Sequence, residues 1–170
     1  MSSRSIDDLS AGFRAQAVLL KDAAEAVGLD LIIYCTRRSF AEQAKLYRNG
    51  RTLAQIQDKA DELCEQWGRA DLATILMDVA PQFGKRILTY AAPGQSYHNY
   101  GLALDAVPLR EGRPVWGDTE PDDLALWNLY GELAGDVNME WGGSWSPGKI
   151  DRPHMQQKNI NWRNLIEDWR

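Results

Sequence analysis

Apolar residues recur at helical spacing through most of the first half of the chain, around one continuous apolar run. In residues 5–28 they return every three or four positions, which predicts a helix. LDLIIYC, residues 29–35, is almost wholly apolar and predicts a buried strand. Ser39 and Thr52 each open a capping box, so each predicts a helix start. The helices expected in this half span residues 5–28, 39–50, 52–68 and 71–80.

The second half mixes strand-like segments with turn formers. PGQS, residues 93–96, has the composition of a turn. The strands expected here span residues 86–91, 101–109 and about 139–141, and the helices span 120–134 and 162–170. Helices first and strands later predict an α+β fold, with a small, mostly antiparallel sheet and flanking helices. We expect one domain over residues 1–170.

The chain contains two histidines, His98 and His154. They lie in SYHNYGLALD and DRPHMQ, segments rich in polar residues and turn formers, and not on an apolar helix face. Asp105 falls within the strand expected after His98, on the same face as Gly101 and Ala103. A carboxylate among apolar strand residues needs a partner or a ligand, because burying a bare carboxylate is very costly.

These residues have the chemistry of a catalytic zinc site, in which three protein ligands leave a fourth position to water. His98, Asp105 and His154 supply two imidazoles and one carboxylate. Asp151, three residues before His154, is placed to take a proton from water as it attacks a carbonyl carbon. The structural alternatives are a packed histidine, a turn-capping or arginine-paired Asp105, and a turn residue at Asp151.

The motif SxHxxGxAxD followed by DxPHxQ resembles the D-Ala-D-Ala carboxypeptidase and L-alanyl-D-glutamate endopeptidase superfamily. Within it, the chain resembles phage endolysins and related bacterial wall peptidases. Upstream, Arg38, Ser39 and Gln43 resemble the family's Arg-Ser/Thr-x-x-x-Gln segment. The resemblance spans about residues 30–157. Its later matches are Ser96, His98, Gly101, Ala103, Asp105, EWGGSW at 140–145, Asp151, Pro153, His154 and Gln156.

The resemblance implies a Hedgehog/DD-peptidase-like fold and Zn²⁺ bound by His98, Asp105 and His154. It implies that Asp151 is the general base. It also implies that Arg38 contacts the substrate or the developing oxyanion, whose negative charge a fixed positive charge stabilises.

Four further residues are candidates for substrate contact: Ser96, Gln43, Trp141 and Trp145. The two tryptophans lie in or next to a Gly-rich segment close to the metal motif, where an indole can stack on a sugar or a peptide. Packing in the core is the alternative for both. Ser96 is as readily a turn former or a helix cap.

The chain departs from the family pattern in two places. Arg37 stands before Arg38 where relatives usually have an aromatic residue, so either arginine can be the one that acts. A helical insertion at about 53–84 precedes the zinc segment and can reshape the substrate groove. Two interpretations of Glu140 stay open: its side chain contacts a ligand histidine, or it only stands at the end of a strand.

Net charge and the pattern of apolar residues disfavour several classes of protein. A net charge of −5 argues against a general nucleic-acid binder. The chain shows neither a signal-peptide pattern nor the roughly 20 apolar residues of a membrane span. We therefore expect a monomer made in the cytoplasm that acts on the bacterial cell wall after release, without membrane insertion or a separate wall-binding domain. Cys35 and Cys64 are expected to be structural thiols.

The expected function is hydrolysis of peptidoglycan stem peptides. DRPH, in place of a Glu-containing segment before the last ligand, favours cleavage between L-Ala and D-Glu over removal of a terminal D-Ala. A non-catalytic zinc-bearing wall-binding module is a second hypothesis, which the presence of Asp151 disfavours. A glycosidase using Glu140 and Asp151 is a third, but it leaves both histidines unexplained.

Overall fold

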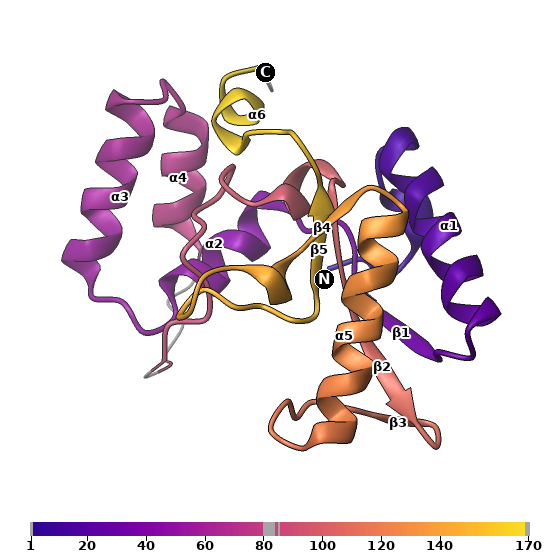
Figure 1. Cartoon of the computed structure of the whole chain (residues 1–170). Coiled ribbons are helices and arrows are strands. Elements are labelled where there is room, and N and C mark those ends of the chain that lie inside the picture. The colour runs from indigo at the N-terminus through magenta and orange to yellow at the C-terminus, as the bar shows by residue number, and fades with distance from the viewer. Residues whose placement is uncertain (1, 80–83, 85, 169–170) are drawn as a thin grey trace. The chain divides into compact units, whose positions relative to one another are not determined.

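The computed structural model of the chain divides into two compact units, and Figure 1 labels their helices and strands. We call them the sheet unit and the helical unit and describe each by itself. The sheet unit comprises Ser3–Arg37 and Gly101–Asn159, and the helical unit comprises Met1–Ser2, Arg38–Tyr100 and Ile160–Arg170. The residues that the structure describes are 2–79, 84 and 86–168. The expectation of one domain over residues 1–170 stays a prediction.

The sheet unit contains the antiparallel sheet that the sequence predicts. Its strands run in the order β1-β2-β5-β4, with β3 paired to β2, and the described pairings are antiparallel. The strands are β1 (Leu31–Cys35), β2 (Ala103–Arg110), β3 (Arg113–Pro114), β4 (Met139–Trp141) and β5 (His154–Gln157). The helices are α1 (Ala11–Ala26) and α5 (Pro121–Asp136), with the 3-10 turns η1 (Ile6–Asp8) and η3 (Gly142–Ser144).

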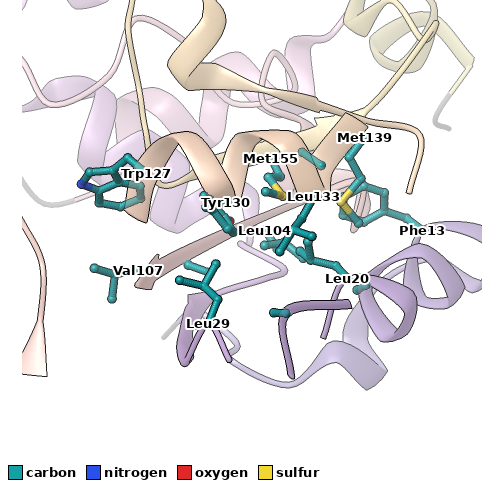
Figure 2. Close-up of a cluster of buried hydrophobic side chains, with 14 of the residues drawn as sticks. Phe13, Leu20, Leu29, Leu104, Val107, Trp127, Tyr130, Leu133, Met139 and Met155 are labelled. Carbon is teal, nitrogen blue, oxygen red and sulfur yellow. The ribbon is translucent and has the colours of Figure 1, made fainter. Parts of the chain in front are cut away.

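The core of this unit lies between the two helices and the sheet (Figure 2). Phe13 and Leu20 of α1 and Tyr130 of α5 are fully buried there, with Leu104 and Met155 from the strands. Because alternate strand residues point to opposite faces, burying Leu104 and Met155 turns their neighbours in sequence to the other face. The packing of the core thereby orients the polar residues of β2 and β5.

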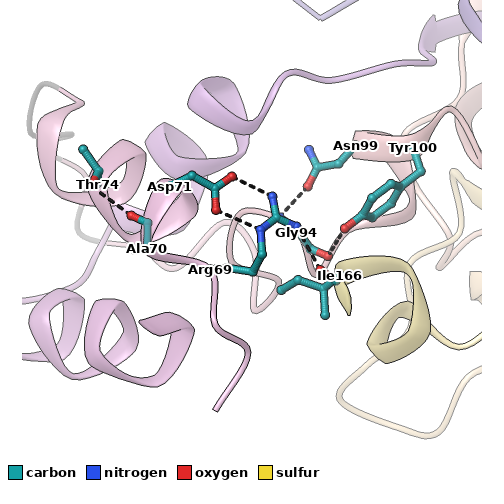
Figure 3. A network of polar contacts seen from close by, with 8 residues as sticks. All are labelled: Arg69, Ala70, Asp71, Thr74, Gly94, Asn99, Tyr100 and Ile166. Carbon is teal, nitrogen blue, oxygen red and sulfur yellow. Dashed lines mark hydrogen bonds and ion pairs between the residues drawn. The ribbon is translucent and has the colours of Figure 1, made fainter. Parts of the chain in front are cut away.

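The helical unit contains α2 (Phe40–Arg48), α3 (Leu53–Glu65), α4 (Ala70–Asp78), η2 (Tyr97–Tyr100) and α6 (Trp162–Asp168). Leu63, Leu72 and Ile166 form part of its separate core. Arg69 ties α6 to this core, since its Nη1 donates to the Ile166 carbonyl at 2.9 Å and its guanidinium pairs with Asp71 (Figure 3). Hydrogen bonding to Asp71 raises the pKa of Arg69 above its usual value.

Both predicted capping boxes lie at helix starts. The Ser39 hydroxyl accepts from the Glu42 backbone N–H at the start of α2. At the start of α3 the Thr52 and Gln55 side chains cap each other's backbone N–H groups. Local signals therefore place these two helices correctly.

The strand expected at residues 86–91 is wrong, because this segment has no regular secondary structure and pairs with no strand among the described residues. Side chains bind its carbonyl groups instead. Asn49 donates to the carbonyl of Arg86, and Arg51 donates to that of Thr89. Gln43 donates to the carbonyl of residue 91 at 2.8 Å. These side chains take the place of a partner strand.

Two other expected elements differ from the structure, and the strands β3 and β5 are not among those expected from the sequence. The first α-helix begins at Ala11, not at residue 5, because the chain is extended at Leu9 and the Ser10 N–H donates to the Gly101 carbonyl at 3.0 Å. The strand β1 is only partly buried, with Ile32 exposed, because it lies at one end of the strand order and has a neighbour on one side only.

Parts of three expected segments lie outside the described residues. Residue 80 ends the expected helix 71–80, residues 80–83 fall within the insertion expected at 53–84, and residue 85 follows that insertion. Residues 169–170 end the expected helix 162–170. In the part of the chain that the structure does describe, we find no helix with the length and apolar character to cross a membrane.

Gly101 is expected to resist substitution. Its φ of +66° lies in the left-handed region, and an added Cβ would come within 3.0 Å of the Ser10 nitrogen. We expect Gly101→Ala to lower the free energy of unfolding by about 1–3 kcal/mol, since both the backbone conformation and the contact are unfavourable. Chemical denaturation would measure this. Gly148 also has a positive φ but open space around it, so Gly148→Ala isolates the conformational part.

Candidate active site

Asp105 and His154 face each other across neighbouring strands. They are paired residues in the register of β2 and β5. The Nδ1 atom of His154 lies 3.1 Å from Oδ1 of Asp105, and both residues are buried, each 8% exposed. Two ligand atoms on one tetrahedral zinc ion lie roughly 3.3–3.5 Å apart, given zinc–ligand distances of about 2.0–2.2 Å. The pair therefore fits a shared zinc ion with little adjustment.

The other ring nitrogen of His154 is also held. Its Nε2 lies 3.1 Å from Oε1 of Gln156, two residues along β5 on the same face of the strand. The Trp145 ring packs on the imidazole, with the centroids 5.3 Å apart. Trp145 in turn donates its Nε1–H to Oε1 of Glu140 at 2.6 Å. The orientation of the His154 ring is thus fixed by contacts at both nitrogens and on its face.

Asp151 lies in an exposed turn whose backbone is tightly held. Its N–H donates to the Gly142 carbonyl at 3.0 Å, and its own carbonyl accepts from the His154 N–H at 3.2 Å. An added Cβ on Gly142 would lie 2.4 Å from the Asp151 carbonyl oxygen, so this close approach needs glycine. The Trp141 indole donates to the Arg152 carbonyl at 2.7 Å. The turn therefore presents the Asp151 carboxylate on a rigid backbone.

Tyr130 of α5 also forms a hydrogen bond to the turn that contains Asp151. It is fully buried on α5, and its hydroxyl donates to the Pro153 carbonyl at 3.2 Å. Burial raises the pKa of Tyr130 well above its usual value, and the nearby carboxylate of Asp105 raises it further. The phenol consequently stays protonated and remains a donor at neutral pH.

His98 lies in the helical unit, in the turn η2, where it is 2% exposed. Its carbonyl accepts from the Arg38 N–H at 3.0 Å. The buried side chain of Asn99 fastens the same segments, since its amide donates to the Arg38 carbonyl at 3.0 Å and accepts from the Gly94 N–H at 2.9 Å. These hydrogen bonds fix the position of the Arg38 backbone relative to the residues around His98.

The side chain of Arg38 is positioned by Gln43. Its Nη1 donates to Oε1 of Gln43 at 2.8 Å, and Gln43 is fully buried. Arg37 is exposed and belongs to the sheet unit. Of the two arginines, Arg38 is the one held by other side chains among the contacts described, which suits an arginine with a fixed role.

Comparison with known proteins places the chain in a family. A family profile described as D-alanyl-D-alanine carboxypeptidase matches residues 7–115, more than half of the chain, and a second profile with the same description matches residues 90–157. The peptidoglycan L-alanyl-D-glutamate endopeptidase CwlK of Bacillus subtilis (strain 168) is 33% identical over 153 residues, which cover 88% of this chain and 73% of the relative. The chain belongs to the D-Ala-D-Ala carboxypeptidase and L-alanyl-D-glutamate endopeptidase superfamily.

Two solved structures with limited similarity have related names. The L-Ala D-Glu endopeptidase ChiX of Serratia marcescens is 18% identical, with a TM-score of 0.46 over 92% of this chain and 88% of that chain. The vancomycin-resistance D,D-pentapeptidase VanY, solved in complex with Zn(II), is 16% identical, with a TM-score of 0.47 over 88% of this chain and 72% of that chain.

Within the motifs of this superfamily, the structure brings together several predicted residues inside each unit. Asp105 and His154 meet in the sheet unit, and Trp145 lies against His154. Arg38 and Gln43 meet in the helical unit. Ser96 is also in that unit, buried at the turn before His98, where its carbonyl accepts from the Asn99 N–H. Trp141 lies against Gly131 and Gly143.

Sequence reasoning missed three supporting residues of this superfamily site. Tyr130 reads as one more apolar position on an amphipathic helix. Gln156 and Asn99 stand inside the recognised motifs, but a motif does not say which atoms their amides contact. For Gln156 and Asn99, their position within two residues of a candidate ligand is a signal that could have singled them out. Cys35 and Cys64, both within the described residues, form no disulfide.

Proposed function

We propose that this chain hydrolyses the bond between L-Ala and D-Glu in the stem peptides of bacterial peptidoglycan. The superfamily consists of peptidases that act on peptidoglycan peptides. The relative at 33% identity is named for this bond. The observation that carries the proposal is the buried Asp105–His154 pair, with Asp151 held on a rigid turn three residues before His154.

We further propose that the reaction uses zinc, bound by His98, Asp105 and His154. The pair in the sheet unit has the donor chemistry and spacing for zinc, and His98 precedes Asp105 by seven residues along the chain. Zinc, when bound, supplies Lewis acidity toward the scissile carbonyl and the attacking water.

Residues of the chain itself are proposed to transfer the proton, stabilise the developing charge and contact the substrate. Asp151 takes the proton from water as it attacks the carbonyl carbon, and it then passes this proton to the leaving amine. Arg38, held by Gln43, places a fixed positive charge near the negative charge that develops on the substrate. Ser96 and Trp145 are proposed to contact the stem peptide. Gln43 and Trp141 support Arg38 and the Asp151 turn respectively.

Removal of a terminal D-Ala is the second candidate, because both matching family profiles have the description D-alanyl-D-alanine carboxypeptidase. The two reactions leave different products. Cleavage between L-Ala and D-Glu creates new amino termini on D-Glu, whereas the carboxypeptidase reaction releases free D-Ala.

Digestion of purified peptidoglycan tests this proposal. We expect new amino termini on D-Glu by mass analysis, loss of activity after a strong chelator, and recovery when Zn²⁺ is added back. Free D-Ala as the main product would establish the carboxypeptidase reaction instead. Full activity after complete removal of metal would disprove the zinc mechanism, and a zinc-loaded protein that binds wall without cleaving it would indicate a binding module.

A further inference from the structure

The two ring nitrogens of His154 both face oxygen atoms. Nδ1 lies 3.1 Å from Oδ1 of Asp105, and Nε2 lies 3.1 Å from Oε1 of Gln156. A neutral imidazole has one N–H donor and one lone-pair acceptor, so it can donate to only one of these two oxygens. An ionised carboxylate has acceptor atoms only. A neutral His154 is therefore fully satisfied if Nε2 donates to Gln156 and the Nδ1 lone pair is directed to a cation beside Asp105.

We propose that Gln156 is a positioning residue for zinc, whose side-chain carbonyl accepts the Nε2–H of His154 and so keeps the Nδ1 lone pair available to the metal. This inference rests on the proposed zinc site. In this role Gln156 neither contacts the substrate nor takes part in a step of the reaction. It also explains why an amide is buried on this face of β5, where Gln156 is 7% exposed.

The strand geometry holds Gln156 in place for this role. It is paired with Ala103 of β2 on one side and with Glu140 of β4 on the other. Its partner on β2, Ala103, has a small side chain, and the partner of His154 on the same strand is Asp105. Because His154 and Gln156 are two residues apart on one strand, their side chains point to the same face, while Gln157 points to the opposite face.

An acceptor role makes glutamate the informative substitution. A glutamate side chain has the size of glutamine, and its ionised carboxylate can only accept hydrogen bonds. Gln156→Glu therefore preserves the contact if Gln156 accepts from Nε2–H, and it breaks the contact if the amide instead donates to an Nε2 lone pair. Gln156→Met keeps the length of the side chain and removes both functions.

Zinc affinity, measured by competition with a chromophoric chelator, tests the proposal without relying on activity. Loss of a partner that orients a metal-binding histidine typically costs about 10–100-fold in metal affinity. We expect this loss for Gln156→Met, and zinc affinity within about threefold of the unmodified chain, or tighter, for Gln156→Glu. The matched control is Gln157→Met, which should bind zinc as the unmodified chain does. Thermal unfolding of each variant checks that it folds.

Two results would overturn the assignment: zinc affinity unchanged in Gln156→Met, or as strongly reduced in Gln156→Glu as in Gln156→Met. If Gln156→Met does not fold, long-range ¹⁵N correlation spectra of the zinc-loaded unmodified chain decide, since the only other histidine is His98. We expect a proton on Nε2 of His154, and a proton on Nδ1 would contradict the proposal. A chain that binds no zinc at all would instead disprove the proposed metal site, so the two failures are distinguishable.

Discussion

Replacement of Asp151 by asparagine is expected to lower kcat by about 10²–10⁴-fold, the usual contribution of a general acid–base group, while zinc binding stays unchanged. The substitution removes the proton acceptor but preserves the size of the side chain. The backbone contacts of Asp151 with Gly142 and His154 do not depend on the carboxylate. Because Asp151 is exposed, its loss of charge should leave the stability of the fold nearly unaffected.

The measurement is turnover of a defined muropeptide together with zinc content. Asp136→Asn serves as the matched control, because Asp136 is likewise an exposed carboxylate of the sheet unit, at the end of α5. We expect this variant to keep full activity. Turnover by Asp151→Asn within about threefold of the unmodified chain would remove Asp151 from the role of base. Loss of zinc in that variant would show that Asp151 acts on the metal site instead.

Residues whose roles depend on nearby sequence could be recognised from the sequence. The capping boxes predicted at Ser39 and Thr52 each involve a residue three positions away. The box at Thr52 is complete in the structure, and at Ser39 the hydroxyl accepts from the Glu42 N–H. The order of apolar and polar residues also placed β2 and α5 within a few positions of their ends. In local patterns of this kind, the residues whose contacts produce the element lie close together in the sequence.

Contacts between distant segments could not be recognised in the same way. Residues 86–91 have a strand-like composition, but their carbonyls are taken by side chains such as Arg51, far away in the sequence. The superfamily motifs indicated Asp105 and His154 as ligands, yet only the β2–β5 register shows that they are direct neighbours. The support from Tyr130 depends on how α5 packs on the sheet, which no motif encodes.

The motifs also gave no reason for their glycines, and the structure supplies it. Gly142 lets the Asp151 turn approach β4, and Gly101 has a positive φ beside the backbone of Ser10. A rigid backbone around the candidate ligands suits catalysis, because it fixes the reacting groups before the substrate arrives. The monomeric state, the release to the cell wall and the choice of Ser96 as a substrate contact stay predictions.

Replacement of His98 by alanine is expected to weaken zinc binding by more than about 100-fold, since even the loss of an outer partner typically costs 10–100-fold. This prediction tests whether a histidine of the helical unit joins the two ligands of the sheet unit. His154→Ala should have an effect of similar size. Tyr97→Phe is the local control, because it changes the same turn but removes only a hydroxyl that donates to the Ile160 carbonyl.

Zinc titration of the folded variants would measure these effects, with circular dichroism to confirm that each variant keeps its helices. Unchanged affinity in His98→Ala would confine the metal site to the sheet unit. Cys35 would then be the residue to examine as a third ligand, because it pairs with Asp105 in the register of β1 and β2 and is buried. Loss of zinc in both His98→Ala and His154→Ala, with Cys35→Ala unaffected, would support His98, Asp105 and His154 as the ligands of a site open to water and substrate.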